Sequence, residues 1–234
     1  MDLPSSSPGP EDELPVPKEK HPAASPMRIG LGVAIGLTLL WVISPSKFIG
    51  QRKAADRTEA INHIKEIYLA LEEFDSDYGR FPDASTSSRV VAISHTKLTL
   101  GDGSSNQLFR QLFAAGLERE RLFYARIAGA IRPDDRFDDD AHALSRGECA
   151  FAYIPGLSSH SPPETPVLMT PMIPGTTRFD PKPFDGKAVI LRIDGSAKAM
   201  PIDDSGRIMV EGKDLFDPSN PLWEGKAPDI KWPE

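Results

Sequence analysis

The sequence predicts an α+β protein in which a long N-terminal membrane helix continues as an amphipathic helix packed on a small antiparallel sheet. Three observations support this prediction. Residues 29–49 are largely apolar, apolar side chains recur every three or four residues between Gln51 and Tyr78, and an Asp-Gly pair separates two apolar runs near residue 194. About 20 apolar residues span a bilayer, the three-and-four spacing is typical of an amphipathic helix, and Asp-Gly between apolar runs favours a hairpin.

The first 28 residues are predicted to form a disordered, proline-rich tail. They contain seven prolines, no aromatic residue, and five acidic against three basic side chains. Such a segment buries too little apolar surface to offset the entropy of ordering. From residue 50 onward, 29 acidic and 23 basic side chains give a net charge of −6, with both signs interspersed. This distribution argues against nucleic acid as a partner.

Residues 29–49 are predicted to form a transmembrane anchor. Every residue from Ile29 to Ile43 is apolar, glycine or threonine. The only charge of the segment, Lys47, can extend toward the membrane surface. The alternative is a cleaved secretory signal, but the long proline-rich region before the segment and Pro45 between two small serines favour an uncleaved anchor. Basic residues are balanced on the two sides, so charge alone does not orient the segment.

The helix predicted after the anchor, within residues 50–82, has an apolar face and a charged face. The apolar face is formed by Ile61, Ile64, Ile67, Tyr68, Leu71, Phe74 and Tyr78. The solvated face carries Glu59, Lys65, Glu66, Glu72, Glu73, Asp75 and Asp77. Gly79 favours a left-handed C-terminal cap and Pro82 prevents continuation, so the helix is expected to end near Tyr78. Anchor and helix together are expected to form one rod, bent at Pro45.

A particular combination of residues marks this part of the chain. It consists of Pro45 in the apolar helix, Gly50 and Ala55 after it, and the run Asp77-Tyr78-Gly79-Arg80-Phe81-Pro82 at the end of the amphipathic helix. With these residues the chain resembles the major pseudopilin of type II secretion systems over residues 29–82. The resemblance implies a pilin-like fold and a protein whose N-terminal helix packs with others into a short periplasmic filament, the pseudopilus.

The cleavage motif of that family is replaced in this sequence. The resemblance implies a glycine at the peptidase site and a glutamate buried in the filament, and the matching positions are Ala23 and Arg28, with Pro26 between them. Burying a guanidinium without a partner would carry a large desolvation cost. We therefore expect that the chain is not processed as a prepilin.

Residues 83–234 are predicted to form an extracytoplasmic α+β domain. The apolar island Val90-Val91-Ala92-Ile93 predicts a short strand. Ser104 or Ser105 is predicted to cap a helix that carries the apolar residues between Leu108 and Phe113, ends near Gly116 and packs on the sheet.

The sheet itself is predicted from the C-terminal third of the chain. A hairpin joins residues 187–193 to 196–200 through Asp194-Gly195. Further strands are expected at residues 150–153, 167–170 and 208–210. The irregular, aromatic stretch 215–233 is expected to wrap back over the domain surface.

No catalytic, cofactor-binding or metal site is predicted. The histidines that follow the anchor have no nucleophile motif near them; they are His63, His95, His142 and His160. Gly101-Asp102-Gly103 lacks the third glycine and the lysine of a phosphate-binding turn, so a linker with a helix cap explains it. The acidic run 134–140 lacks the central glycine and terminal glutamate of the twelve-residue calcium loop and is interpreted as a solvated surface loop. Cys149, the only cysteine, is predicted to pack in the core.

The sequence therefore predicts a non-enzymatic, single-pass protein of the inner (cytoplasmic) membrane with residues 50–234 periplasmic. The expected partners are the lipid bilayer and pilin-like or secretion-system proteins, without nucleic acid and without a small-molecule substrate. One hypothesis is a pseudopilin-like component of a type II secretion or type IV pilus-like system. The alternative is a membrane-tethered extracytoplasmic binding module that has a pilin-like fold and no longer assembles into filaments.

Overall fold

The computed structural model describes residues 45–234, of which Ser46–Glu234 form one compact unit. The predicted tail, the cleavage-site positions and the anchor up to residue 44 lie outside the described residues. Within residues 45–234, no helix is long and apolar enough to cross a membrane. The elements in chain order are α2 (Pro45–Tyr78), α3 (Ser87–Ser94), α4 (Ser105–Ala114), the 3-10 helix η1 (Glu120–Phe123), β1 (Ala152–Tyr153), β2 (Pro166–Thr170), β3 (Lys187–Arg192), β4 (Ala197–Pro201), β5 (Met209–Val210), β6 (Lys213–Asp214) and the 3-10 helix η2 (Pro221–Trp223).

Helix α2 has the predicted apolar face. Its fully buried side chains follow the four-three alternation of a helix packed on one side: Ala60, Ile64, Ile67, Leu71, Phe74 and Tyr78. Ile61 and Tyr68 are half-buried at the edges of this stripe. The helix ends at Tyr78 as predicted, with Gly79 at φ 83° and its N–H donating to the carbonyl of Asp75 at 2.7 Å.

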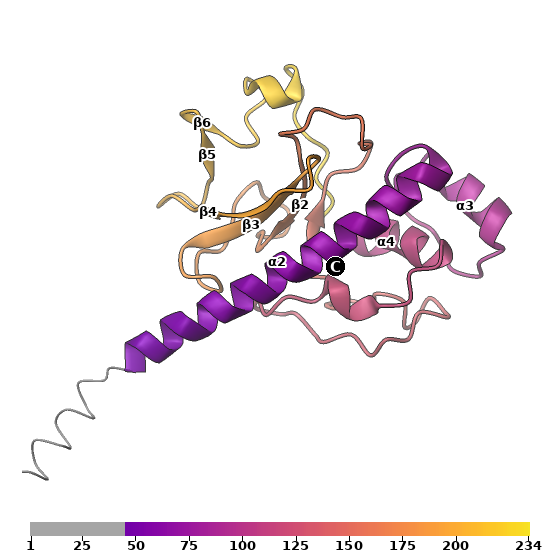
Figure 1. The fold of residues 1–234 in the computed structure, drawn as a ribbon, viewed down its shortest axis with the longest axis horizontal. Helices are drawn as coiled ribbons and strands as arrows, with labels where there is room; N and C mark the ends of the chain where they lie inside the picture. Colours follow the sequence, from indigo (N-terminus) through magenta and orange to yellow (C-terminus); the bar gives the residue numbers. More distant parts are fainter. Residues whose placement is uncertain (1–44) are drawn as a thin grey trace, which may run out of the picture. The chain divides into compact units, whose positions relative to one another are not determined.

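The N-terminal part of α2, residues 45–55, extends beyond the rest of this unit (Figure 1). A side chain added at Gly50 would meet no atom within 4 Å. Contacts to the domain begin at Asp56, which pairs with Arg126 at 3.1 Å, and at Arg57, which donates to the carbonyl of Phe184 at 3.1 Å. Among residues 46–234, nothing therefore covers this end of the helix, and the other end belongs to the core.

The predicted antiparallel sheet is present, with strands in the order β1-β2-β3-β4. Every pair is antiparallel, and the β3–β4 hairpin sets Val189 opposite Ala199. The turn of this hairpin is longer than the two-residue turn expected from Asp194-Gly195. The N–H of Gly195 bonds back to the carbonyl of Arg192, and Gly195 alone takes a positive φ, 74°. A side chain there would also lie 2.9 Å from the ring of Tyr68 on α2.

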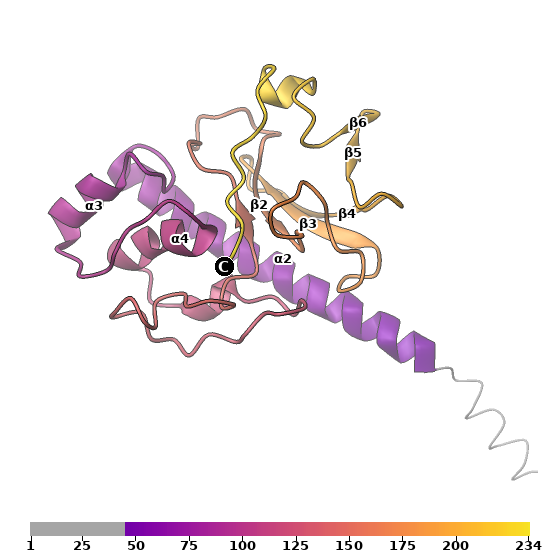
Figure 2. The same cartoon turned by 180° about the vertical axis from the view of Figure 1, so that it is seen from behind.

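The sheet separates two hydrophobic cores. In β3, Val189 and Leu191 belong to the core that contains α2 and α4, while Ala188 and Ile190 belong to a second core. The second core is covered by the segment after β4, which contributes Ile208, Leu215, Phe216, Trp223 and Ile230. Figure 2 shows this C-terminal segment running back toward the centre of the fold. The stretch predicted to wrap over the surface thus closes the far face of the sheet.

The chain end is also tied to the sheet. Tyr153 of β1 and Lys231 exchange two backbone hydrogen bonds, at 2.9 and 2.8 Å. The N–H of Ser105, at the start of α4, donates to the carbonyl of Trp232 at 3.1 Å. The last residues therefore connect the sheet with α4.

The prediction of a strand at residues 90–93 is wrong, because these residues lie in α3. Only Val90 is buried, whereas Val91 and Ile93 are exposed. Asp83 stabilises the turn that leads into this helix. Its Oδ1 accepts hydrogen bonds from the N–H groups of Ser85 and Thr86, at 2.7 and 3.1 Å. These bonds satisfy donors at the helix start that a strand would have to pair elsewhere.

Helix α4 has the predicted cap and position. Ser104 accepts a hydrogen bond from the N–H of Gln107 at 3.2 Å. The ring of Phe109 lies 5.0 Å from the ring of Tyr153 in β1, so α4 packs on the edge of the sheet. Gln111, on the same helix, donates to the carbonyl of Asp83 at 2.8 Å and thereby links α4 to the cap of α3.

Asp75, predicted on the solvated face of α2, is buried instead. The loop after β1 covers it, and both the N–H and the hydroxyl of Ser159 donate to its Oδ2. A buried carboxylate requires such donors. The helix therefore contacts the domain over a wider arc than the apolar stripe alone.

We predict that Leu71→Asp lowers the free energy of unfolding by at least about 3 kcal/mol, because it removes a fully buried side chain and buries a charge. Leu69→Asp is the matched control: it makes the same change two residues away at a position that is 67 % exposed. It should change stability by less than about 0.5 kcal/mol. Urea unfolding of the full-length chain in detergent, followed by tryptophan fluorescence, measures both. Equal effects would contradict the assignment of the stripe.

Candidate functional site

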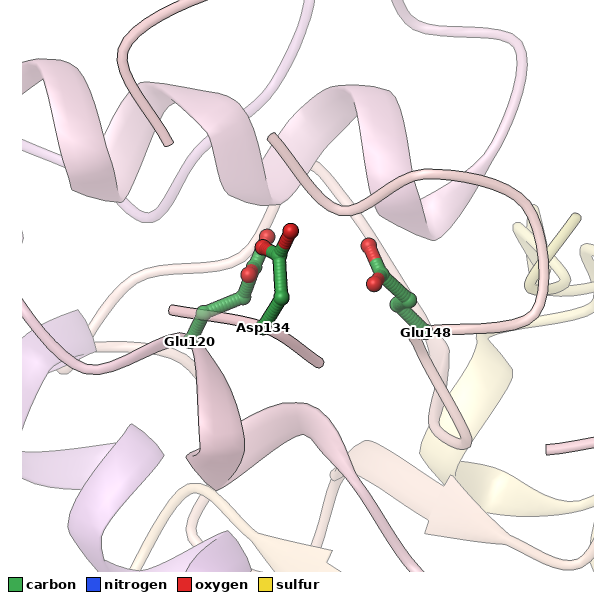
Figure 3. Close-up of side chains that lie close together, drawn as sticks. All are labelled: Glu120, Asp134 and Glu148. Carbon is green, nitrogen blue, oxygen red and sulfur yellow. The ribbon is translucent and has the colours of Figure 1, made fainter. Parts of the chain in front are cut away.

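Three carboxylates converge between α4 and β1. Glu120 begins η1, Asp134 lies in the following loop, and Glu148 lies in the turn before β1. One ligand oxygen from each residue can be chosen so that all three lie within 4.8 Å of one another. Figure 3 shows the three carboxyl groups directed toward a common point. These residues are called the acidic cluster below.

Glu120 is the most buried member of the acidic cluster, with an exposed fraction of 0 %. Its Oε1 accepts a hydrogen bond from the N–H of Leu144 at 2.5 Å, whereas its Oε2 has no hydrogen-bond partner. Burial, together with the negative charges of Glu148 and Asp134, raises the pKa of Glu120 to about 7. Near neutral pH this side chain is therefore divided between its protonated and ionised forms.

The other two members of the acidic cluster are held by local hydrogen bonds. Glu148 is buried, and its Oε2 accepts from the N–H and the hydroxyl of Ser145 at 2.8 and 2.5 Å. Asp134 is exposed and accepts from the N–H of Arg136 at 2.9 Å. Within residues 45–234, none of the three carboxylates forms an ion pair with a lysine, arginine or histidine. The cluster thus holds an excess of negative charge in a partly buried place.

The sequence does not predict this cluster. Of the acidic run 134–140 only Asp134 belongs to it, and Asp139 and Asp140 bind other groups. Asp139 binds His142 at 2.7 Å, and Asp140 accepts from the N–H and hydroxyl of Thr99 at 2.7 and 2.5 Å. Glu120 and Glu148 are 28 residues apart and belong to no motif. Their burial is the signal that distinguishes them, and the sequence does not report it.

The histidines considered as catalytic residues in the sequence make ordinary hydrogen bonds or lie at the surface. The Nδ1 of His63 lies 2.8 Å from the carbonyl of Tyr124. Ser159 binds both Asp75 and His160, but there the serine lies between the carboxylate and the imidazole, whereas a serine hydrolase places the histidine in the middle. His95 is exposed at the end of α3.

The Gly101-Asp102-Gly103 turn is filled by a side chain of the protein itself. The N–H of Gly103 donates to Oε1 of Gln107 at 3.1 Å. A side chain at Gly101 would lie 2.2 Å from the same oxygen. The N–H of Gly103, which a phosphate would need as a donor, is already bonded to Gln107. The structure therefore agrees with the interpretation of this turn as a linker.

Cys149 is buried as predicted. Its exposed fraction is 3 %, and burial raises the pKa of its thiol to about 12. A neutral, covered thiol is a poor nucleophile.

A hollow of about 420 Å³ lies between α2 and the end of α4. Its lining includes Glu73, Asp77, Leu112, Leu117, Glu118 and Arg119. These side chains mix charged and apolar groups on the surface, and they do not include the acidic cluster.

Comparisons with protein-family models, with curated proteins and with solved structures found no match for this chain.

We predict that ionisation of Glu120 lowers stability as pH rises. The pKa of Glu120 is raised from 4.5 to about 7 in the folded chain, so the folded form binds the proton more tightly than the unfolded form. Its contribution to stability is complete below pH 4.5 and is lost as pH increases through 7. The slope reaches at most about 1.4 kcal/mol per pH unit.

The measurement is urea unfolding between pH 5 and 8 in excess chelator, for the wild type and for Glu120→Gln. Subtracting the two curves removes the contributions of other groups. The wild type should lose stability relative to Glu120→Gln across this interval. Parallel curves would show that Glu120 ionises normally.

Proposed function

We propose that the chain is a non-enzymatic, membrane-anchored, pseudopilin-like protein, a component or relative of a type II secretion or type IV pilus-like system. Residues 29–49 are its anchor in the inner membrane, and residues 50–234 lie outside the cytoplasm. The observation that carries this proposal is the uncovered end of α2, whose first residues belong to that anchor.

The uncovered end of α2 exposes large apolar side chains. Phe48 is 63 % exposed and Ile49 is 58 % exposed. Adjacent exposed apolar groups of this kind are typical of surfaces that contact a membrane or another protein. Both residues fall in the last part of the predicted anchor, so a bilayer or a neighbouring helix can cover them.

The other end of α2 is fixed firmly to the domain. The hydroxyl of Tyr68 donates to the carbonyl of Ile193 at 2.5 Å, beside the β3–β4 turn. Asp75 binds the loop after β1, and Arg57 binds the loop before β3. A domain attached at several points along the helix follows the position of the helix, which supports a role as a subunit placed by helix packing.

We predict that the full-length protein stays in the membrane pellet after alkaline carbonate washing and is released only by detergent. The reason is the length of the apolar segment, which is close to that of a bilayer. Recovery of a soluble species that starts near Lys47 would identify the segment as a cleaved signal and overturn the anchor.

The second candidate function is a membrane-tethered extracytoplasmic binding module. It is favoured by one observation, the replacement of the cleavage motif by Ala23, Pro26 and Arg28. An unprocessed chain lacks the free amine that a pseudopilin pairs with a buried glutamate, so it would not join a filament in the ordinary way.

Intact mass of the mature protein, from cells with an active prepilin peptidase, distinguishes an unprocessed chain from an ordinary filament subunit. We expect a chain that retains residues 1–28. A chain that begins at Ala24 with a methylated amine would contradict this expectation and make the protein an ordinary filament subunit.

We predict that a cysteine at position 160 is labelled from the periplasmic side only. His160→Cys is suitable because His160 is exposed, whereas Cys149 is buried and should not react in the folded wild type. The wild type is therefore the control for background labelling. Labelling of His160→Cys from the cytoplasmic side alone would reverse the orientation.

A further inference from the structure

We propose that the acidic cluster of Glu120, Asp134 and Glu148 is a divalent-cation site. This inference does not depend on the proposed function. It rests on the spacing of three oxygens, on a buried oxygen without a partner, and on the absence of a compensating cation among residues 45–234.

The spacing of the cluster fits a calcium ion. Oxygens bind Ca²⁺ at about 2.3–2.6 Å, so two ligands of one ion are separated by at most about 5 Å. The three carboxylates meet this limit, since one oxygen from each lies within 4.8 Å of the others. A cluster without histidine or cysteine disfavours Zn²⁺.

The orphan oxygen of Glu120 points to a ligand. Its Oε2 is buried and accepts no hydrogen bond, although Oε1 of the same group is bonded to the N–H of Leu144. Figure 3 shows the Glu120 carboxyl group directed toward the other two carboxyls. A buried acceptor without a donor is costly, and a metal ion removes that cost.

The charges around the cluster favour a cation as well. The carboxylates whose charges act on Glu120 are those of Glu148 and Asp134. Arg121, which follows Glu120 in the chain, is paired with Asp135 at 2.7 Å and forms no pair with the cluster. A divalent ion would offset the mutual repulsion of the three carboxylates.

The site is expected to bind Ca²⁺ weakly. Three carboxylates supply fewer ligands than the six to eight that Ca²⁺ takes, so waters would complete the shell. The dissociation constant should lie in the range of about 10⁻⁴ to 10⁻³ M that is known for extracellular modules.

The test is calorimetric titration of CaCl₂ into the full-length chain in detergent, after removal of divalent ions with chelator, together with thermal unfolding in Ca²⁺ and in chelator. The wild type should bind one Ca²⁺ and gain stability from it. Glu120→Gln and Glu148→Gln should each weaken binding at least tenfold. Asp138→Asn is the matched control, because it removes a carboxylate of the same loop outside the cluster, and it should bind as the wild type does.

Glu120→Gln also distinguishes loss of a ligand from loss of the fold. In chelator this variant should unfold cooperatively, as the wild type does. In Ca²⁺ only the wild type should gain stability. No binding by the wild type, or equal binding by Glu120→Gln, would overturn the proposal.

Discussion

The apolar stripe of α2 packs against one face of the sheet, and the positions of most other elements follow from this contact. Fully burying one leucine or phenylalanine stabilises a fold by about 1.5–3 kcal/mol, and α2 supplies several such residues in one row. The row fixes the distance between helix and sheet. Helix α4 and η1 then complete the same core through Phe109 and Phe123, whose ring centroids are 4.8 Å apart.

The same sheet is apolar on its other face, which explains the long irregular end of the chain. Alternate residues of β3 point to opposite sides, so Ala188 and Ile190 would be exposed without a second cover. The segment after β4 supplies that cover with little regular structure of its own. It buries Trp223, whose indole N–H donates to the carbonyl of Leu215 at 2.6 Å, and its backbone rejoins β1 near residue 231.

Local signals allowed much of the fold to be predicted. The end of α2, the cap of α4 and the β3–β4 hairpin are each determined by residues close in sequence: Gly79, Ser104 and Asp194-Gly195. Helix α3 was missed because a short apolar run is compatible with a strand or a helix. Its cap depends on Asp83 and its support on Gln111, 28 residues later. The acidic cluster was missed for the same reason, since only the tertiary fold brings Glu120, Asp134 and Glu148 together.

The attachments of α2 are distributed along its length, and this arrangement has a mechanical consequence. They begin at Asp56 and continue past Tyr68 to Asp75, whose carboxylate accepts a hydrogen bond from the N–H of Ser159 at 3.1 Å. A force applied along the axis of the uncovered end would load these contacts in shear, all at once. A force applied across the axis would open them one after another, beginning at Asp56. The helix should therefore transmit a push or pull along its axis to the domain far better than a sideways one.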